Sequence, residues 1–194
     1  MKKINIFPVA IFLFILNFEY SCSTNTVGNN YEIAEITNFI ITARNNLVEN
    51  NCEMNEQSNK LNKYDTCRYN KYLIYIGLEL NIIKNHGGLY GVKIADSLKE
   101  LLVISNNDYN ENYKKGDTLN NIITIYNEAG SAFNDNGFCE LLPNFIKKTQ
   151  NFGSCILFFT EPPEIKRLHR FTIQYKAYNR KLFSDTTVSV YIKP

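Results

Sequence analysis

The sequence predicts a mainly β domain, folded as an antiparallel sandwich with one or two short helices. Apolar and polar residues alternate at period two over residues 72–82, and again over residues 169–177 and 186–192 near the C-terminal end. Further short apolar runs are separated by polar turn segments at the spacing typical of sandwiches. An immunoglobulin-like or similar sandwich fits this pattern.

The first part of the domain is the least clear. Residues 31–48 are ambiguous, because Ile33, Ile36 and Ile40 fall near helical spacing while Ile, Thr and Phe favour a strand. Residues 49–68 are polar and rich in Asn and Lys, which predicts a long loop.

Residues 72–82 form the clearest expected strand, because every second residue is Tyr, Ile or Leu. The next strands are expected at residues 98–105 and 119–126. Residues 141–148 predict a short helix, since Pro143 would stand in the first turn, where proline is tolerated.

Residues 156–160 are expected to form a strand that Pro162-Pro163 ends. The C-terminal residues then predict a hairpin, with strands at 169–177 and 186–192 and a turn near 179–180. Strands joined so closely are expected to pair in antiparallel fashion.

The N-terminal residues are typical of an export signal. Met1-Lys2-Lys3 is basic, and residues 4–18 are apolar but shorter than the roughly 20 residues of a membrane-spanning helix. Ser21-Cys22-Ser23 follows, and a small residue directly before Cys resembles the lipobox of bacterial lipoproteins. We therefore expect a signal peptide at 1–21.

The lipobox resemblance implies cleavage before Cys22 and acylation of this cysteine, which would anchor the chain in the lipid bilayer of the outer membrane. Residues 22–30 would be a tether, and 31–194 a single β-rich domain. Glu19 departs from the common lipobox pattern, which has Leu there. Cleavage after Ser23 by ordinary signal peptidase is the alternative, and it would give a secreted or periplasmic protein.

Composition limits the possible functions. The chain has 194 residues, of which 44% are hydrophobic and 21% charged, enough for a real core. The formal net charge is only +2, without the basic footprint typical of nucleic-acid binding. No nucleic-acid partner is expected.

Four cysteines remain beyond the anchor, and an even number in an exported chain predicts two disulfides. Three pairings are possible. We favour Cys52–Cys67 and Cys139–Cys155, because each closes a short loop. The cysteine intervals are too long for a typical zinc site, so neither a metal nor a cofactor is expected.

Motifs for catalysis are weak, and no catalytic residue is expected. Residues 108–112 begin like a calcium loop, but the sixth and twelfth positions of that pattern are occupied by Tyr113 and Leu119. A hydrolase would have to use His169 with Glu161 or Glu164 as its acid and base.

Two stretches carry a family resemblance. The first consists of residues 105–110 followed by Tyr113, Gly116 and residues 118–120. The second consists of residues 160–162 followed by residues 169–173. They resemble a family of Gram-negative bacterial lipoproteins of unknown function. The resemblance implies an anchored β domain, and no site residue follows from it.

These expectations favour a non-enzymatic binding module, anchored in the cell envelope, that contacts a protein or a glycan through Tyr-rich strands. The chain has 13 Tyr, and exposed tyrosines are common in binding surfaces. The alternative is a periplasmic inhibitor or immunity protein that blocks a toxin or lytic enzyme. A hydrolase is the third hypothesis.

Overall fold

The computed structural model describes residues 32–46, 58–84, 92–127, 138–149 and 154–194. Within these ranges the chain is mainly β, with antiparallel sheets in a sandwich-like arrangement and a single α-helix, so the predicted fold class is confirmed. The expected signal peptide, Cys22 and the tether lie outside the described residues.

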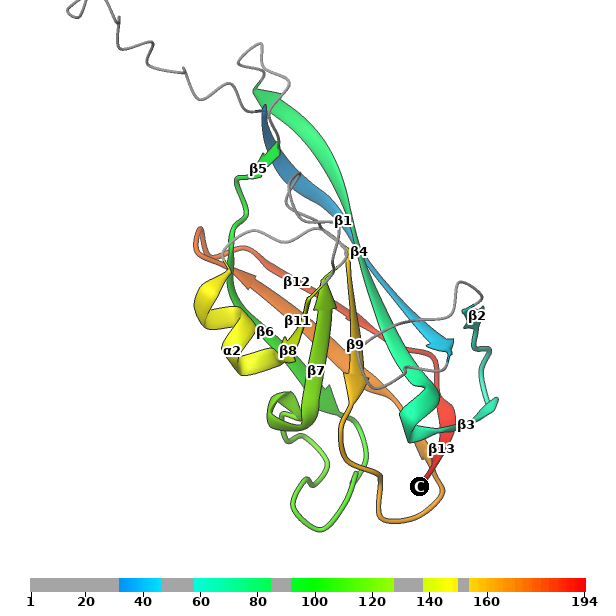
Figure 1. The fold of residues 1–194 in the computed structure, drawn as a ribbon. Coiled ribbons are helices and arrows are strands. Elements are labelled where there is room, and N and C mark those ends of the chain that lie inside the picture. Colours follow the sequence, from blue (N-terminus) through cyan, green and yellow to red (C-terminus); the bar gives the residue numbers. More distant parts are fainter. Residues whose placement is uncertain (1–31, 47–57, 85–91, 128–137, 150–153) are drawn as a thin grey trace, which may run out of the picture.

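The largest sheet, called the first sheet here, runs along one side of the molecule (Figure 1). Its strand order is β2-β1-β4-β9-β7-β8, and β5 pairs in parallel with the start of β1. The strands are β1 (Glu32–Asn45), β2 (Asn59–Lys60), β4 (Tyr72–Lys84), β5 (Val92–Ile94), β7 (Ile123–Asn127), β8 (Phe138–Leu141) and β9 (Cys155–Phe159).

Two three-stranded sheets complete the β structure. The second sheet has the order β12-β11-β6, and the third has the order β10-β13-β3, in which β13 and β3 are parallel. Their strands are β3 (Thr66–Arg68), β6 (Leu98–Ser105), β10 (Arg167–His169), β11 (Phe171–Ala177), β12 (Leu182–Thr186) and β13 (Val190–Lys193).

Aromatic rings join the sheets across the core. The ring of Phe39 on β1 lies edge-on to Tyr175 on β11, with centroids 6.0 Å apart. Phe171 on β11 contacts Phe159 on β9 and Tyr72 on β4, at 5.0 Å and 5.7 Å. Such ring pairs add about 0.5–1.5 kcal/mol each beyond the area they bury. They hold the second sheet against the first.

One helix covers an end of the core. The helix α2 (Leu142–Lys148) matches the predicted one, and Pro143 stands in its first turn. Leu142 and Phe145 are fully buried, while Lys147 and Lys148 lie in the last turn, where cations interact favourably with the helix dipole.

The ambiguous N-terminal stretch is a strand. Residues 32–45 form β1, which pairs with β4 along its whole length. A long partner strand supplies backbone hydrogen bonds to the β-branched residues here, and this outweighs the approximate helical spacing. The predicted loop at 49–68 is wrong in part, because β2 and β3 lie within it; residues 47–57 are outside the described ranges.

Two further strand predictions need correction. The expected strand at 119–126 begins with the 3₁₀ turn η2 (Asn120–Ile122), and only then continues as β7. The expected C-terminal hairpin has the wrong second strand, because β11 pairs with β12 at residues 182–186 rather than with residues 186–192. Thr187 forms two hydrogen bonds with the backbone of Phe171: its Oγ1 accepts from the Phe171 N–H, and its N–H donates to the Phe171 carbonyl. After this residue the chain leaves the second sheet, and β13 pairs with β10 in the third sheet.

The predicted disulfides are wrong. Cys67 is a buried thiol rather than half of a disulfide, and every pairing of the four cysteines into two disulfides needs it. The favoured Cys139–Cys155 bond is also excluded by topology. Cys139 on β8 and Cys155 on β9 lie on opposite sides of β7, about two strand spacings apart, or roughly 10 Å. The favoured partner of Cys67, Cys52, lies outside the described residues.

Candidate functional site

The candidate site is an edge of β4 that runs beyond the rest of its sheet. β1 and β4 pair from Ile33 opposite Lys84 to Asn45 opposite Tyr72, whereas β9 pairs only with residues 73–76 of β4. From residue 77 to residue 84, no other strand in the described part of the chain borders β4 on this side. Figure 1 shows the two strands continuing past β9 as a narrow arm. We call residues 77–84 the open edge.

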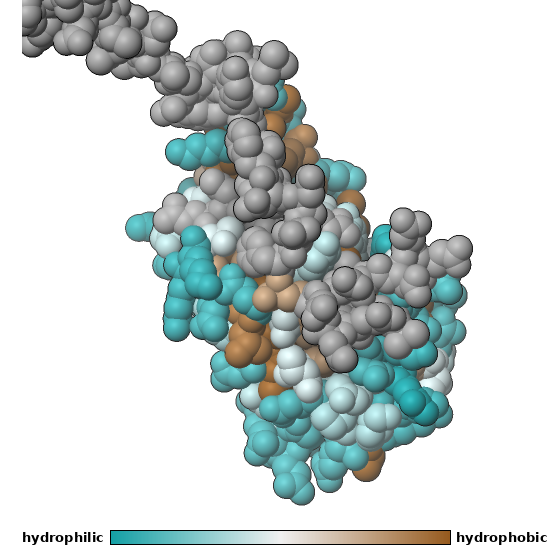
Figure 2. Space-filling model, viewed as in Figure 1, coloured by the Kyte–Doolittle hydropathy of each residue, from teal (hydrophilic) through white to brown (hydrophobic). Residues whose placement is uncertain are grey.

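Aliphatic side chains stand along the open edge. Leu80, Ile82 and Ile83 are 39%, 50% and 52% exposed. Figure 2 shows hydrophobic surface along the upper part of the molecule, where this arm lies. A sheet edge with exposed apolar residues readily pairs with another strand, and natural proteins usually protect such edges with charges, prolines or covering loops. An edge kept in this form is therefore suited to binding.

The opposite edge of the same arm is closed. The N–H of Ile36 on β1 donates to Oδ2 of Asp96 at 2.8 Å, and the N–H of Ala95 donates to the carbonyl of Ala34 at 2.7 Å. The parallel strand β5 pairs with the first residues of β1. The two edges of the arm thus differ: one is occupied by the chain itself, and the other is bordered by no strand of the described ranges.

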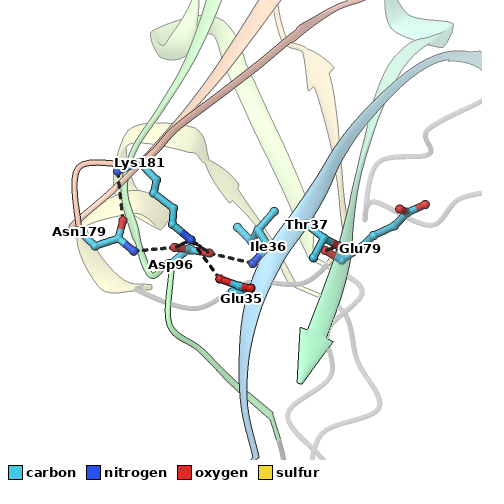
Figure 3. A network of polar contacts seen from close by, with 7 residues as sticks. All are labelled: Glu35, Ile36, Thr37, Glu79, Asp96, Asn179 and Lys181. Carbon is cyan, nitrogen blue, oxygen red and sulfur yellow. Dashed lines mark hydrogen bonds and ion pairs between the residues drawn. The ribbon is translucent and has the colours of Figure 1, made fainter. Parts of the chain in front are cut away.

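Asp96 is the centre of the closed edge (Figure 3). Its side chain is fully buried, and Oδ1 lies 3.0 Å from Nζ of Lys181 and accepts a hydrogen bond from Asn179. Burial alone would raise the pKa of this carboxyl, but the hydrogen bonds from Asn179, the Ile36 N–H and Lys181 lower the pKa below its ordinary value. The ionised carboxylate therefore ties the turn between β11 and β12 to β1.

Gly77 marks the point where the open edge begins. A Cβ atom there would lie 3.1 Å from the ring of Tyr75 and 3.8 Å from Cβ of Ile40. The glycine therefore leaves space for the Tyr75 ring, which also carries the guanidinium of Arg44 at 4.8 Å from its centroid.

The residues of the hydrolase hypothesis do not form a site. His169 is fully buried, while Glu161 and Glu164 are exposed. No group in the described ranges forms a hydrogen bond with either ring nitrogen of His169. Burial, and secondly the charge of Arg167, lower the pKa of His169 to about 4. The imidazole packs against the rings of Tyr109 and Phe171, so His169 is a packing residue of the core.

Other expected site residues are placed as follows. No cluster of three or more His, Cys, Asp or Glu residues suited to a metal occurs in the described part of the chain. Asn110 in the loop that begins like a calcium site accepts the N–H groups of Asn112 and Tyr113, which makes it a turn. No helix in the described ranges is long and apolar enough to cross a bilayer. Cys22 lies outside these ranges.

The tyrosines are divided between core and surface. Tyr72, Tyr109 and Tyr175 are buried, whereas Tyr64 and Tyr191 are exposed on neighbouring segments. The ammonium groups of Lys63 and Lys166 lie 4.8 Å and 5.5 Å from the Tyr64 and Tyr191 ring centroids. Each of these exposed rings therefore forms a cation–π contact with a lysine. Both rings lie on segments other than the open edge.

The open edge was not expected from the sequence, in which Leu78, Leu80 and Ile82 continue the period-two pattern of one apolar strand face. The length of β4 is the signal that could have indicated it. A strand of 13 residues is longer than the usual five or six, so it extends past a neighbour of ordinary length, as it does past β9.

Comparisons with known proteins identify no relative of this chain. No protein-family model matches it, and no curated protein or solved structure is significantly similar to it.

Proposed function

We propose that the chain is a non-enzymatic binding module, tethered to the outer membrane of a bacterial envelope through acylated Cys22, and that its partner adds a β-strand to the open edge of β4. The observation that carries this proposal is the run of main-chain groups along residues 77–84 with Leu80 and Ile82 exposed beside it. In strand addition, main-chain hydrogen bonds supply affinity and alternate side chains supply specificity.

The position of the arm supports the tethered part of the proposal. β1 begins at Glu32, ten residues after Cys22, and this end of β1 belongs to the arm. A stretch of about ten residues spans at most roughly 36 Å. The open edge would therefore stay close to the membrane surface, where an envelope protein anchored nearby can reach it.

Photo-crosslinking in living cells tests the binding edge. A photoreactive phenylalanine analogue is placed at position 80 of the full chain, and in a matched variant at position 178, because Tyr178 is 58% exposed but lies on the turn after β11. We expect a protein adduct from position 80 and none from position 178. Absence of any adduct at position 80 in a folded, correctly located chain would exclude strand addition at this edge.

Detergent-phase partitioning tests the tether separately. The native protein is expected in the membrane phase, and a Cys22→Ala variant in the aqueous phase. If both remain aqueous, the module diffuses freely, and the anchor is excluded whatever the crosslinking shows.

A further inference from the structure

The hydrogen bonds of the arm show which residues of β4 offer their backbone to the open edge. The N–H of Asn46 donates to the carbonyl of Lys71, and Oγ1 of Thr37 donates to the carbonyl of Glu79, so odd-numbered residues of β4 direct their backbone groups toward β1. In an antiparallel strand these directions alternate. The even-numbered residues 78, 80 and 82 therefore direct N–H and C=O outward.

The N–H of Ile36 gives independent support for this alternation. It lies opposite Leu80 in the register and points away from β4, because it donates to Asp96. Leu80 thus directs its backbone to the other side, toward the open edge. The side chains of residues 78, 80 and 82 share one face, since side chains in a strand alternate between faces.

Two copies of this strand can pair only in a few registers. If a two-fold axis perpendicular to the sheet relates them, opposing residues lie on the same face, so an even residue faces an even one. β9 borders β4 up to Ile76, and a bulge at Ile83 interrupts the regular pairing with β1. The register is therefore centred on one residue within 77–82.

The side chains select the register centred on Leu80. There Leu80 faces its own copy, Leu78 faces Ile82, and Glu79 faces Asn81. A centre at Glu79 would place two carboxylates opposite each other, which is unfavourable. A centre at Asn81 would place Leu78 opposite a lysine. Only the Leu80 register aligns all three aliphatic residues and leaves no like charges facing.

We infer that the strand added to the open edge comes from a second copy of this chain, paired antiparallel about Leu80. The inference rests on the proposed function, because it names the partner of that same edge. The three aligned pairs would exchange about six main-chain hydrogen bonds, two for each directly opposed pair. The outward backbone groups of each edge then form hydrogen bonds with the same groups of the other copy. The exposed leucine and isoleucine side chains pack against those of the other copy.

This dimer is concentration-dependent. A strand pair of this length buries less than the roughly 1,200 Å² of a stable interface, so a dilute solution would hold mainly monomers. Copies tethered to the same membrane are at a much higher effective concentration. The dimer is therefore expected on membranes, and it should be tested there.

Disulfide trapping in membranes from cells expressing the full chain tests the register. In a Leu80→Cys variant the two introduced thiols lie opposite each other, and the roughly 5.5 Å between Cα atoms of a hydrogen-bonded pair suits a disulfide. In the matched Asn81→Cys variant the two copies of position 81 are offset along the strands and lie too far apart. Mild oxidation should give a covalent dimer with Leu80→Cys, and neither with Asn81→Cys nor with the native chain.

Three outcomes would overturn the inference: equal trapping at both positions, stronger trapping at position 81, or no dimer at all. Thermal unfolding of both variants confirms that they fold, since Leu80 and Asn81 are exposed. The photo-crosslinking result separates the two proposals. An adduct from position 80 with another protein and no trapped dimer would leave the binding edge in place and remove the second copy as its partner.

Discussion

Nζ of Lys181 lies 3.0 Å from Oδ1 of Asp96, a carboxylate whose side chain has no solvent exposure. Nearly half of the lysine side chain is exposed, so the pair joins a buried anion to a cation at the surface. The hydroxyl of Tyr175 also donates to the Asp96 carbonyl at 2.6 Å. This one residue therefore connects β1, the start of β6 and the turn after β11.

Replacing Asp96 should destabilise the fold in a pH-dependent way. Because the folded pKa is below the unfolded one, the carboxylate stabilises the fold above about pH 4, and this contribution is lost as pH falls through the folded pKa. Asp96→Asn should lower the free energy of unfolding at neutral pH by about 2 kcal/mol, the scale of hydrogen bonds to a buried charge. Urea unfolding at several pH values measures this.

A control comes from an exposed ion pair between β11 and β6 of the second sheet. Lys176 and Glu100 are 2.7 Å apart, with both side chains about 40% exposed. Glu100→Gln should change the free energy of unfolding by less than about 1 kcal/mol, as for most surface pairs. An equal loss in both variants would contradict the special role of Asp96.

His169 should make the protein sensitive to mild acid. Its folded pKa of about 4 lies below the value near 6.5 of an unfolded histidine, so the unfolded state binds more protons between these values. Stability is then full above about pH 6.5, and up to about 3 kcal/mol is lost as pH falls toward 4. His169→Phe should remove this dependence and relieve two buried nitrogens. If the variant keeps the same acid sensitivity, His169 is not its source.

The buried thiol of Cys67 should react only when the protein unfolds. Cys67 is 3% exposed, and burial raises its pKa to about 11. Alkylation at pH 8 should be slow in the native protein and rapid in guanidinium chloride, because the thiolate is the reactive form. Peptide mapping without reduction provides the check. Finding Cys67 in a disulfide would contradict the structure.

Tyr64 should be replaceable by asparagine but not by valine. It stands at φ +72° in a turn that the Asp65 N–H closes onto the carbonyl of Asn62. Left-handed backbone costs an ordinary residue about 1–2 kcal/mol, and asparagine tolerates it best among residues with a side chain. Tyr64→Asn should be at least as stable as the native protein, and Tyr64→Val less stable. Equal melting temperatures of the two variants would exclude strain at this position.

The sequence predicted correctly those strands and helices that are determined by the pattern of their own residues. β4, β6 and α2 were expected within two residues of their observed ends, because period-two alternation and a proline in the first helical turn act locally. The C-terminal hairpin failed for a different reason. Alternation shows which side of a strand is apolar but not which sheet the strand joins, and the break at Thr187 depends on a contact with Phe171.

The site could not be predicted for the same physical reason. Leu78, Leu80 and Ile82 continue the alternation of Ile74 and Ile76, which are fully buried. Only the position of β9 decides where the buried part of β4 ends, and that pairing joins residues about 80 positions apart in sequence. The cysteine prediction failed similarly, since loop length cannot show that β7 lies between Cys139 and Cys155.

The place of β13 has a consequence for how the chain reaches its native state. This strand comes last in chain order, yet it lies in the middle of its sheet, between β10 and β3. The two outer strands are about 100 residues apart in sequence and meet only through it. The sheet therefore cannot assemble from either end during synthesis, and its formation waits for residues 190–193. Closing contacts of such long range is slow, so we expect this sheet to be the last part of the β structure to form.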